Sequence, residues 1–547
     1  MSDSIEHKTT EPEFPNRLVY FLALVFVAVG IINSTPLIPG WDELWRGITG
    51  IEKLKTRTFP TEWFYPFVFS LMMLLVALKH SMWRSWKGTN KAVFGAFMDV
   101  ALVVSALAVS LTYLIEIDSV CLIDLMSGER ARIMSETLKA EIEFAETMGL
   151  PKPDTVEDPK CVSTTGVWLV AIMGSALIVF LGYNIKVWGF PLVAISLGIA
   201  AYTIITVLVW YFHGPDGINK YLVTKLGGEP RTFLDGVPNV HDALVNNASG
   251  FLGRFMHVIM NVVFPYIILG ALFGKSAGGQ TLIKLAFRWT RKLRGGPAHA
   301  AIVSSAMFGT ITGGPIVNVL STGVLTIPMM IKRGFSRVFA GGMEAAASSG
   351  GSIMPPVMGV AAFILAAMTA VPYRDVIIAA ALPALAYFLC LFLSASFQSR
   401  KQGINAFGKL TDEMRVSGQD ILHLCQIILP ILLILVLLLT PKDMVGCGFV
   451  SSLFGANTII ENGRCTVISL PWVFQIFQNA AGDAGATGWW AAAFVMVLLF
   501  LDKDFRSKPG KLLDALAESG ITISTLYLMF LAVTVIDVCL NFTGLSK

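Results

Sequence analysis

The chain has 547 residues, of which 54% are hydrophobic and only 14% charged, with a formal net charge of +4. Soluble domains carry about 25% charged residues, so this composition excludes an ordinary water-soluble enzyme. The small net charge gives no argument for binding to nucleic acid, so no nucleic-acid partner is expected. Apolar residues also occur in runs of about twenty, which is long enough to cross a ~30 Å hydrocarbon core. The sequence therefore predicts an all-α, polytopic integral membrane protein that lies in a lipid bilayer.

About eleven apolar runs follow one another along the chain, and each predicts a transmembrane helix. They cover residues 18–35, 61–78, 92–115, 165–184, 188–212, 252–274, 338–370, 375–397, 419–440, 487–501 and 520–540. The tail before the first run is acidic and polar, unlike the start of a secretory signal peptide. We therefore expect the first run to be a retained span.

The distribution of basic residues predicts the orientation of these spans. Segment 79–91 holds four Lys or Arg and no acid, and segment 275–294 holds six and no acid. Loop 117–163 instead holds ten acids against five Lys or Arg. By the positive-inside rule, we expect the N-terminus of this multi-pass protein to be cytoplasmic and its C-terminus periplasmic. Loop 36–59, with four basic residues, fits this orientation poorly.

Two pairs of cysteines fall in predicted outer loops. Cys121 and Cys161 flank one of these loops, while Cys447 and Cys465 lie in another. An oxidising periplasm would permit a disulfide within each loop, and the alternative is four unpaired thiols. The charged stretch 129–148 in the first loop predicts a solvated or interfacial helix.

Nothing in the sequence has the spacing of metal ligands, and no nucleophile with its base can be nominated. We therefore predict no catalytic residues and no organic cofactor. An intramembrane enzyme remains the weakest of the alternatives. ATP-driven transport is not expected either, because the chain has no GxxxxGK[ST] loop.

The segment 295–331 predicts a re-entrant helical hairpin. It is apolar, yet both of its flanks are basic and predicted to be cytoplasmic, so a single crossing would invert every later span. A hairpin over 296–331 that turns near Gly313, Gly314 and Pro315 avoids this inversion. A turn at membrane depth needs protein or water around its backbone, and polar groups near the tip would suit such a cavity, namely Thr310, Thr312, Asn318 and Ser321.

The next run, 338–370, predicts a broken helix. Residues 348–352 read Ser-Ser-Gly-Gly-Ser, and Pro355 and Pro356 follow. The prolines remove backbone donors and the glycines favour unwinding. Such a break exposes carbonyl oxygens to a small cation and a helix N-terminus to an anion.

Glu344 is the single acid of this run, and an intramembrane carboxylate is a candidate functional group. In the alternative, Glu344 lies near the cytoplasmic interface of the membrane, where it is either ion-paired or hydrated. For the hairpin and the broken helix together, the alternative is a glycine-rich packing surface between helices.

Two stretches of sequence carry a family resemblance. GGPAHAAIVSSAMFGTITGGPIVNVLSTGVLTIPMMIKRGF and AGGMEAAASSGGSIMPPVMGVAAFI resemble the large-permease region of tripartite ATP-independent periplasmic (TRAP) transporters. They are most similar to fused small-plus-large permeases that work with TAXI-type periplasmic binding proteins. The similarity is dense between residues 264 and 402. By this resemblance, residues 1–250 form a small-permease-like scaffold region and residues 251–547 a large-permease-like transport region.

The resemblance implies an elevator-type secondary transporter that moves an organic anion, a carboxylate, inward with Na⁺. The hairpin tip and the broken helix would form the substrate and ion site: Gly309, Thr310, Thr312, Gly313, Gly314, Asn318, Glu344, Ser348, Ser349, Gly350, Gly351, Pro355 and Pro356. Among these, the implied Na⁺ ligands are Thr310, Thr312, Gly313, Ser349 and Gly350. The chain departs from the family at the tip, because relatives often have Ser, Ser, Ser and Ala at positions 310, 312, 314 and 315.

Relatives continue into a second hairpin beyond the predicted span 520–540. The second half-site is therefore expected to be missing from this chain, either because the permease is split and its other half is encoded separately or because the chain is truncated. We expect a separately encoded C-terminal permease half as a partner, besides the TAXI-type binding protein. The alternative is a degenerate, non-transporting membrane scaffold.

Overall fold

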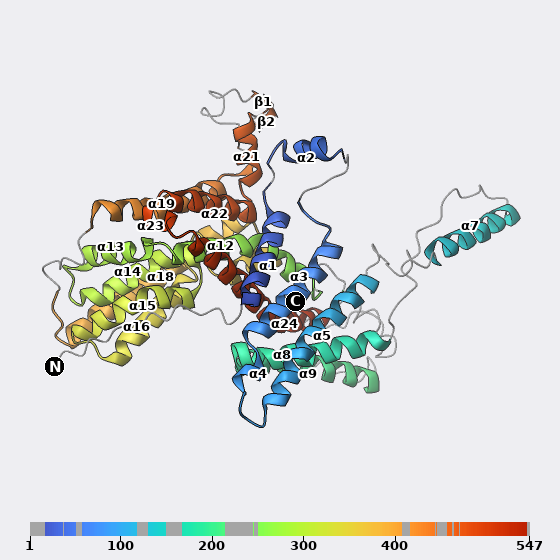
Figure 1. Cartoon of the computed structure of the whole chain (residues 1–547), viewed down its shortest axis with the longest axis horizontal. Coiled ribbons are helices and arrows are strands. Elements are labelled where there is room, and N and C mark those ends of the chain that lie inside the picture. The colour runs from blue at the N-terminus through green and yellow to red at the C-terminus, as the bar shows by residue number, and fades with distance from the viewer. Residues whose placement is uncertain are drawn as a thin grey trace. The chain divides into compact units, whose positions relative to one another are not determined.

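The computed structural model describes residues 17–36, 38–50, 57–116, 129–148, 167–213, 244, 250–406, 416–442, 445, 457–461, 464–469 and 471–543. These residues are almost entirely helical (Figure 1). Nine of the described helices are long and apolar enough to cross a membrane, and three shorter apolar helices accompany them. The predicted fold class, a helical polytopic membrane protein, is confirmed.

Contacts along the chain divide it into two units, of which the first comprises residues 1–26, 59–257 and 521–547. Its complete helices are α3 (Thr61–Lys79), α4 (Met82–Ser85), α5 (Ala92–Glu116), α7 (Glu129–Met148), α8 (Val167–Trp188) and α9 (Phe190–His213). The first part of α1 (Arg17–Ser34) and the residues of α24 (Gly510–Thr543) from Ile521 onward also belong to it. Helix α7 has the bounds predicted for the charged stretch in the first outer loop.

Buried polar contacts hold α24 against two neighbouring helices within this unit. Asn184 Nδ2 in α8 donates to the carbonyl of Leu528 at 2.8 Å, and Ser196 Oγ in α9 donates to that of Ala532 at 3.0 Å. Both side chains are fully buried. Since an unpaired polar group in an apolar interior is costly, these bonds specify which faces of the helices pack together.

The second unit comprises residues 27–58 and 258–520, and α11 (Arg254–Val258) leads into it. Its elements are α2 (Trp41–Thr49), the π-helical turn η2 (Ile259–Val263), α12 (Phe264–Gly274), α13 (Gly278–Thr290), α14 (Gly296–Thr312), α15 (Pro315–Lys332), α16 (Arg337–Gly351), α17 (Val360–Thr369), α18 (Tyr373–Lys401), α19 (Gly418–Leu439), β1 (Asn457–Glu461), β2 (Arg464–Ser469), α21 (Trp472–Ala480), α22 (Ala484–Phe500) and α23 (Lys503–Arg506). Strands β1 and β2 pair antiparallel as a short hairpin.

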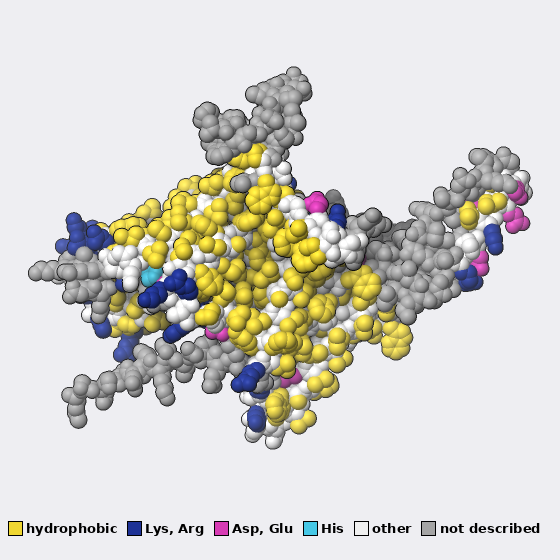
Figure 2. Space-filling view, turned by 45° about the horizontal axis from the view of Figure 1, so that its top comes forward, with side chains coloured by type: hydrophobic (Ala, Val, Ile, Leu, Met, Phe, Trp, Pro, Cys, Tyr) yellow, Lys and Arg dark blue, Asp and Glu magenta, His cyan; other side chains and the backbone are white. Residues whose placement is uncertain are grey.

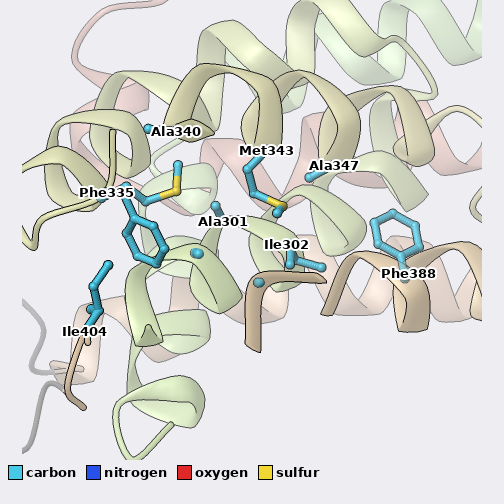
Figure 3. Packing of buried hydrophobic residues seen from close by; sticks show 11 residues of the cluster. Ala301, Ile302, Phe335, Ala340, Met343, Ala347, Phe388 and Ile404 are labelled. Atoms are coloured by element: carbon cyan, nitrogen blue, oxygen red, sulfur yellow. The ribbon is translucent and has the colours of Figure 1, made fainter. Parts of the chain in front are cut away.

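The core of the second unit lies where α14, α16 and α18 pack side by side (Figures 1 and 3). Alanines at the contact allow the three helices to approach closely: Ala298, Ala301, Ala340, Ala347 and Ala395. Larger side chains then fill the remaining space, notably Phe335, Met343 and Phe388. Close packing of this kind resists small changes in shape, so it gives the hairpin and the broken helix a firm support.

Hydrophobic side chains cover much of the surface that Figure 2 shows. On α15, for example, Ile316, Leu320 and Val324 are 65%, 67% and 68% exposed. Exposed apolar surface on this scale is what a lipid environment requires of membrane helices.

The segment 275–294, from which the sequence predicts only a basic cytoplasmic stretch, contains helix α13. Its apolar residues Leu282, Ile283, Ala286 and Phe287 share one buried face. Lys284 pairs with the carboxylate of Asp420 at 3.0 Å. An amphipathic helix therefore carries part of the basic segment.

The predicted disulfides are not tested by the structure. Cys121, Cys161 and Cys447 lie outside the described residues, and of Cys465 only the backbone position in β2 is described.

Candidate functional site

The hairpin is formed by α14 and α15, which meet at a two-residue turn. Gly313 ends α14 in the left-handed conformation, with φ of 59°, and its N–H bonds to the carbonyl of Gly309 at 3.1 Å. Gly314 is extended, and Pro315 begins α15. Glycine adopts positive φ without strain, and proline suits the first position of a helix. The turn thus lies at the residues that the sequence singles out.

The break in the following helix spans residues 352–359, between α16 and α17. The N–H of Ser352 bonds to the carbonyl of Ser349 at 3.1 Å, and that of Gly359 bonds to the carbonyl of Ser352 at 2.6 Å. From α18, the hydroxyl of Tyr373 lies 3.0 Å from the carbonyl oxygen of Pro356 and 2.5 Å from that of Val357. Tyr373 therefore fixes the unwound backbone from outside.

The hairpin tip packs directly against this break through glycines. A Cβ added to Gly309 would lie 2.3 Å from Cα of Gly351, and one added to Gly313 would lie 1.8 Å from the carbonyl oxygen of Met358. Only hydrogen atoms fit in these spaces. The last turns of α14 and α16 therefore meet, and each carries the partial negative charge of a helix C-terminus.

The start of α17 lies close to the hairpin turn that leads into α15. Gly359, which precedes α17, is so close to the tip that its Cβ would lie 3.2 Å from the carbonyl oxygen of Gly313. Gly314 and Pro315, at the start of α15, follow directly in the chain. Helix N-termini attract anions and C-termini attract cations, so the tip and the break together suit an anion and a cation at adjacent positions.

Glu344 lies in the interior between the hairpin arms and α16, and it is fully buried. Its Oε1 accepts hydrogen bonds from Ser305 Oγ at 3.2 Å, from Ser348 Oγ at 3.3 Å and from the hydroxyl of Thr322. Its Oε2 accepts one from the hydroxyl of Thr326. In the described part of the chain no Lys or Arg pairs with it. The carboxyl group is thus held by hydroxyls from three helices.

A polar network continues from Glu344 to the hairpin tip. The hydroxyl of Thr322 lies 2.8 Å from the carbonyl oxygen of Asn318, and Asn318 Nδ2 donates to the carbonyl of Ser305 at 2.9 Å. The same Nδ2 lies against Gly351, since a Cβ on that glycine would come within 2.6 Å of it. The buried carboxyl group and the glycine contact at the tip therefore belong to one connected structure.

The other candidate residues do not all face the contact between the hairpin tip and the break. The hydroxyls of Thr310 and Thr312 bond to carbonyls of their own helix, at 2.7 Å and 3.2 Å. Ser349 is exposed, while its neighbour Ser348 is fully buried. Gly350 packs against the ring of Tyr387. Of the implied Na⁺ ligands, Gly313 is the one whose backbone forms the contact between tip and break.

Sequence reasoning missed Ser305, Thr322, Thr326 and Tyr373. A signal for two of them was present, because Asn318, Thr322 and Thr326 follow one another at intervals of four in an otherwise apolar segment. Residues four apart lie on the same helix face. Their common face is the buried one in α15.

Among the described residues, no group of three or more His, Cys, Asp or Glu side chains could hold a metal ion. A cation at the tip would therefore be held by carbonyl and hydroxyl oxygens, which are ligands that suit hard cations.

Comparison with known proteins finds relatives among the TRAP transporter permeases. The chain is 26% identical over 159 residues to the C4-dicarboxylate TRAP transporter large permease protein DctM of Vibrio cholerae, covering 29% of this chain and 35% of that protein. It is 24% identical over 229 residues to the protein of the same name from Pseudomonas aeruginosa, covering 38% and 52%. It is 35% identical over 98 residues to the isethionate TRAP transporter permease protein DctMQ of Oleidesulfovibrio alaskensis, covering 18% and 15%.

The chain thus spans about half or less of the length of the curated relatives that it matches. The family model for the DctM component of tripartite ATP-independent periplasmic transporters matches residues 169–545. This match includes the hairpin, the break and Glu344. Because it covers well over half of the chain, the protein belongs to the DctM family of TRAP transporter permease components.

Proposed function

We propose that this chain moves an organic anion, a carboxylate, across the bacterial inner membrane together with Na⁺. It would receive the anion from a TAXI-type periplasmic binding protein and work with a separately encoded second permease half. The orientation proposed for it has a cytoplasmic N-terminus and a periplasmic C-terminus.

The observation that carries this proposal is the meeting of four helix ends at the hairpin tip. The C-terminal ends of α14 and α16 approach each other at Gly309 and Gly351. Gly359, which precedes α17, lies against Gly313 in the turn that leads into α15. In secondary transporters, broken helices bind anionic substrate groups at half-helix N-termini and cations at carbonyl oxygens.

The energetics agree with ion-coupled uptake. Each Na⁺ that moves inward releases about 2.3 kcal/mol per 100 mV of membrane potential. A few ions could therefore concentrate an anion that the potential alone would repel.

Uptake of labelled substrate into proteoliposomes tests the proposal. The chain would be reconstituted with its co-purifying membrane partners and a TAXI-type binding protein, and supplied with a C4-dicarboxylate such as succinate. We expect an inward Na⁺ gradient to drive uptake and an equal K⁺ gradient to be without effect.

Gly313→Val supplies the matched inactive variant, because any side chain there meets the carbonyl of Met358. Gly342→Ala is its control, since a Cβ at Gly342 meets nothing within 4 Å. Sodium-independent uptake, or equal uptake by Gly313→Val, would contradict the proposal. No uptake by a well-folded preparation that contains every co-purifying partner would favour the non-transporting scaffold.

A further inference from the structure

Glu344 is the single carboxyl group of residues 295–370, and its environment is unusual for a structural acid. It is fully buried, and its hydrogen-bond partners within the described part of the chain are the hydroxyls of Ser305, Thr322, Thr326 and Ser348. A permanently ionised carboxylate inside a protein is normally paired with a cation, because its desolvation is otherwise uncompensated.

The hydroxyls around Glu344 can satisfy both of its charge states. When the group is ionised, all four hydroxyls can donate to its oxygens. When it is protonated, Thr322 can donate to the carbonyl of Asn318, 2.8 Å away, and Thr326 to the carbonyl of Thr322, 3.0 Å away. The new O–H then donates to a hydroxyl oxygen, so no buried polar group loses its partner in either state.

Among the described residues, the ionisable groups on the neighbouring helices form no ion pair with Glu344. On α14, His299 lies within hydrogen-bond distance of the carbonyl of Gly295 and of Ser396 Oγ. On α18, the Tyr387 hydroxyl donates to the carbonyl of Ala346. On α13, Lys284 pairs with Asp420.

The basic residues nearest in sequence stand at helix ends. Lys332 follows Thr326 by six residues on α15, and Arg337 precedes Glu344 by seven on α16. At 1.5 Å per residue, each lies about 10 Å away along its helix axis. A proton or a visiting cation is therefore what can neutralise this carboxylate.

We propose that Glu344 is an exchangeable proton site, and that its proton is a second coupling ion beside Na⁺. The step is the reversible addition of a proton from water to a carboxylate oxygen, which gives a neutral carboxyl group. The coupling part rests on the proposed transport function, whereas the protonation itself does not.

The network provides a physical link between the proton and the site at the tip. Thr322 changes its acceptor between Glu344 and the carbonyl of Asn318, and the side chain of Asn318 lies against Gly351. Both hairpin arms and α16 supply donors to the same carboxyl group. A change in its charge therefore alters how the hairpin is attached to the broken helix.

Infrared difference spectroscopy of the purified chain in lipid nanodiscs tests protonation without requiring transport. We expect a carbonyl stretching band of a buried, protonated carboxyl group whose intensity changes over the pH range in which the protein stays folded. The band should be absent from Glu344→Gln and shifted in Glu344→Asp. A Glu344 band that stays constant over the whole range, or no band that depends on Glu344, would overturn the proposal.

Thr322→Val supplies a second variant in which the carboxyl group is retained. It removes one donor to the carboxylate while conserving volume, so the pH dependence of the band should differ from that of the unmodified chain. An unchanged titration would show that the network does not control this proton.

Accumulation in proteoliposomes tests the coupling at a fixed Na⁺ gradient. The outside is made one pH unit more acidic than the inside. For each coupled proton, this gradient raises the ratio of internal to external substrate concentration by up to about tenfold. Glu344→Gln should lose this response to the pH gradient. Sodium-driven uptake that ignores the pH gradient, or responds equally in Glu344→Gln, would overturn the coupling. A wild-type chain without any uptake would instead contradict the proposed transport function, and the spectroscopic test would still decide on the proton site.

Discussion

The backbone of Gly309 in α14 lies directly against the backbone of Gly351 in α16. A Cβ on Gly309 would come within 2.3 Å of Cα of Gly351, and a Cβ on Gly351 within 2.9 Å of Cα of Gly309. Neither helix can carry a side chain at this point. The absence of side chains is therefore what lets the hairpin tip touch the end of α16.

Replacing Gly309 by Ala should destabilise the protein, because the added methyl group forces α14 and α16 apart. We expect a loss of about 1–3 kcal/mol, typical of overpacking in a closely packed interior. Thermal unfolding in detergent measures it. Gly342→Ala in α16 is the control and should be neutral or stabilising by up to about 1 kcal/mol, because a Cβ there meets nothing within 4 Å. Equal unfolding temperatures for the two variants would contradict the contact.

Replacing Tyr373 by Phe should loosen the break between α16 and α17. The variant loses the hydroxyl that holds the carbonyls of Pro356 and Val357, at a cost of about 1 kcal/mol. Tyr387→Phe loses a comparable bond to the carbonyl of Ala346, at 2.9 Å, within the regular part of α16. We expect both variants to unfold at lower temperature and only Tyr373→Phe to weaken the response to Na⁺. The same Na⁺ response in both would show that the break does not depend on Tyr373.

Sodium should stabilise the folded chain if the tip binds it. A ligand present at about 100 times its Kd adds about 2.7 kcal/mol to the free energy of unfolding. The unfolding temperature should therefore rise when NaCl replaces KCl at constant ionic strength, and this rise should be absent from Gly313→Ala. An identical rise in the unmodified chain and in Gly313→Ala would place the Na⁺ effect elsewhere.

Asp420→Asn should destabilise the start of α19 by about 1–2 kcal/mol. Asp420 forms a capping box with Ser417 and also accepts hydrogen bonds from Lys284 at 3.0 and 3.1 Å, while its side chain is 7% exposed. Asp375→Asn is the comparison, since Asp375 is 46% exposed and pairs with its neighbour Arg374. Exposed pairs contribute about 0–1 kcal/mol. Chemical or thermal unfolding of the two variants should therefore separate them, and equal losses would contradict the assigned role of Asp420.

The sequence was sufficient to locate the hairpin turn and the break. Gly313 and Gly314 can adopt the backbone conformations that a tight turn needs, and Pro315 suits the start of the next helix. The pair Pro355 and Pro356 removes two backbone donors and disfavours a regular helix. These properties are local, so they can be recognised without knowledge of the neighbouring helices.

The partners of Glu344 depend on how three separate helices face one another. Helix periodicity alone places Ser348, four residues later, on the face of Glu344 and turns Ser349 away. It cannot show that Ser305 and Thr322 meet that face, because this requires the register between α14, α15 and α16. Helix α13 was missed for a different reason. The six Lys and Arg residues of segment 275–294 interrupt its apolar pattern, so the buried face made by Leu282, Ile283, Ala286 and Phe287 was not recognised.

Helix α15 is polar on its inner face and apolar on its outer face. Asn318, Thr322 and Thr326 are buried. In contrast, about two thirds of the surface of Ile316, Leu320 and Val324 is exposed. Peeling α15 away from α16 would turn these polar side chains toward lipid, at ~2 kcal/mol or more for each group left unpaired. We therefore expect the hairpin to move as a rigid body with α16 and not to open by a hinge motion of α15. Any movement that opens a path to the tip has to carry α14, α15 and α16 as one piece.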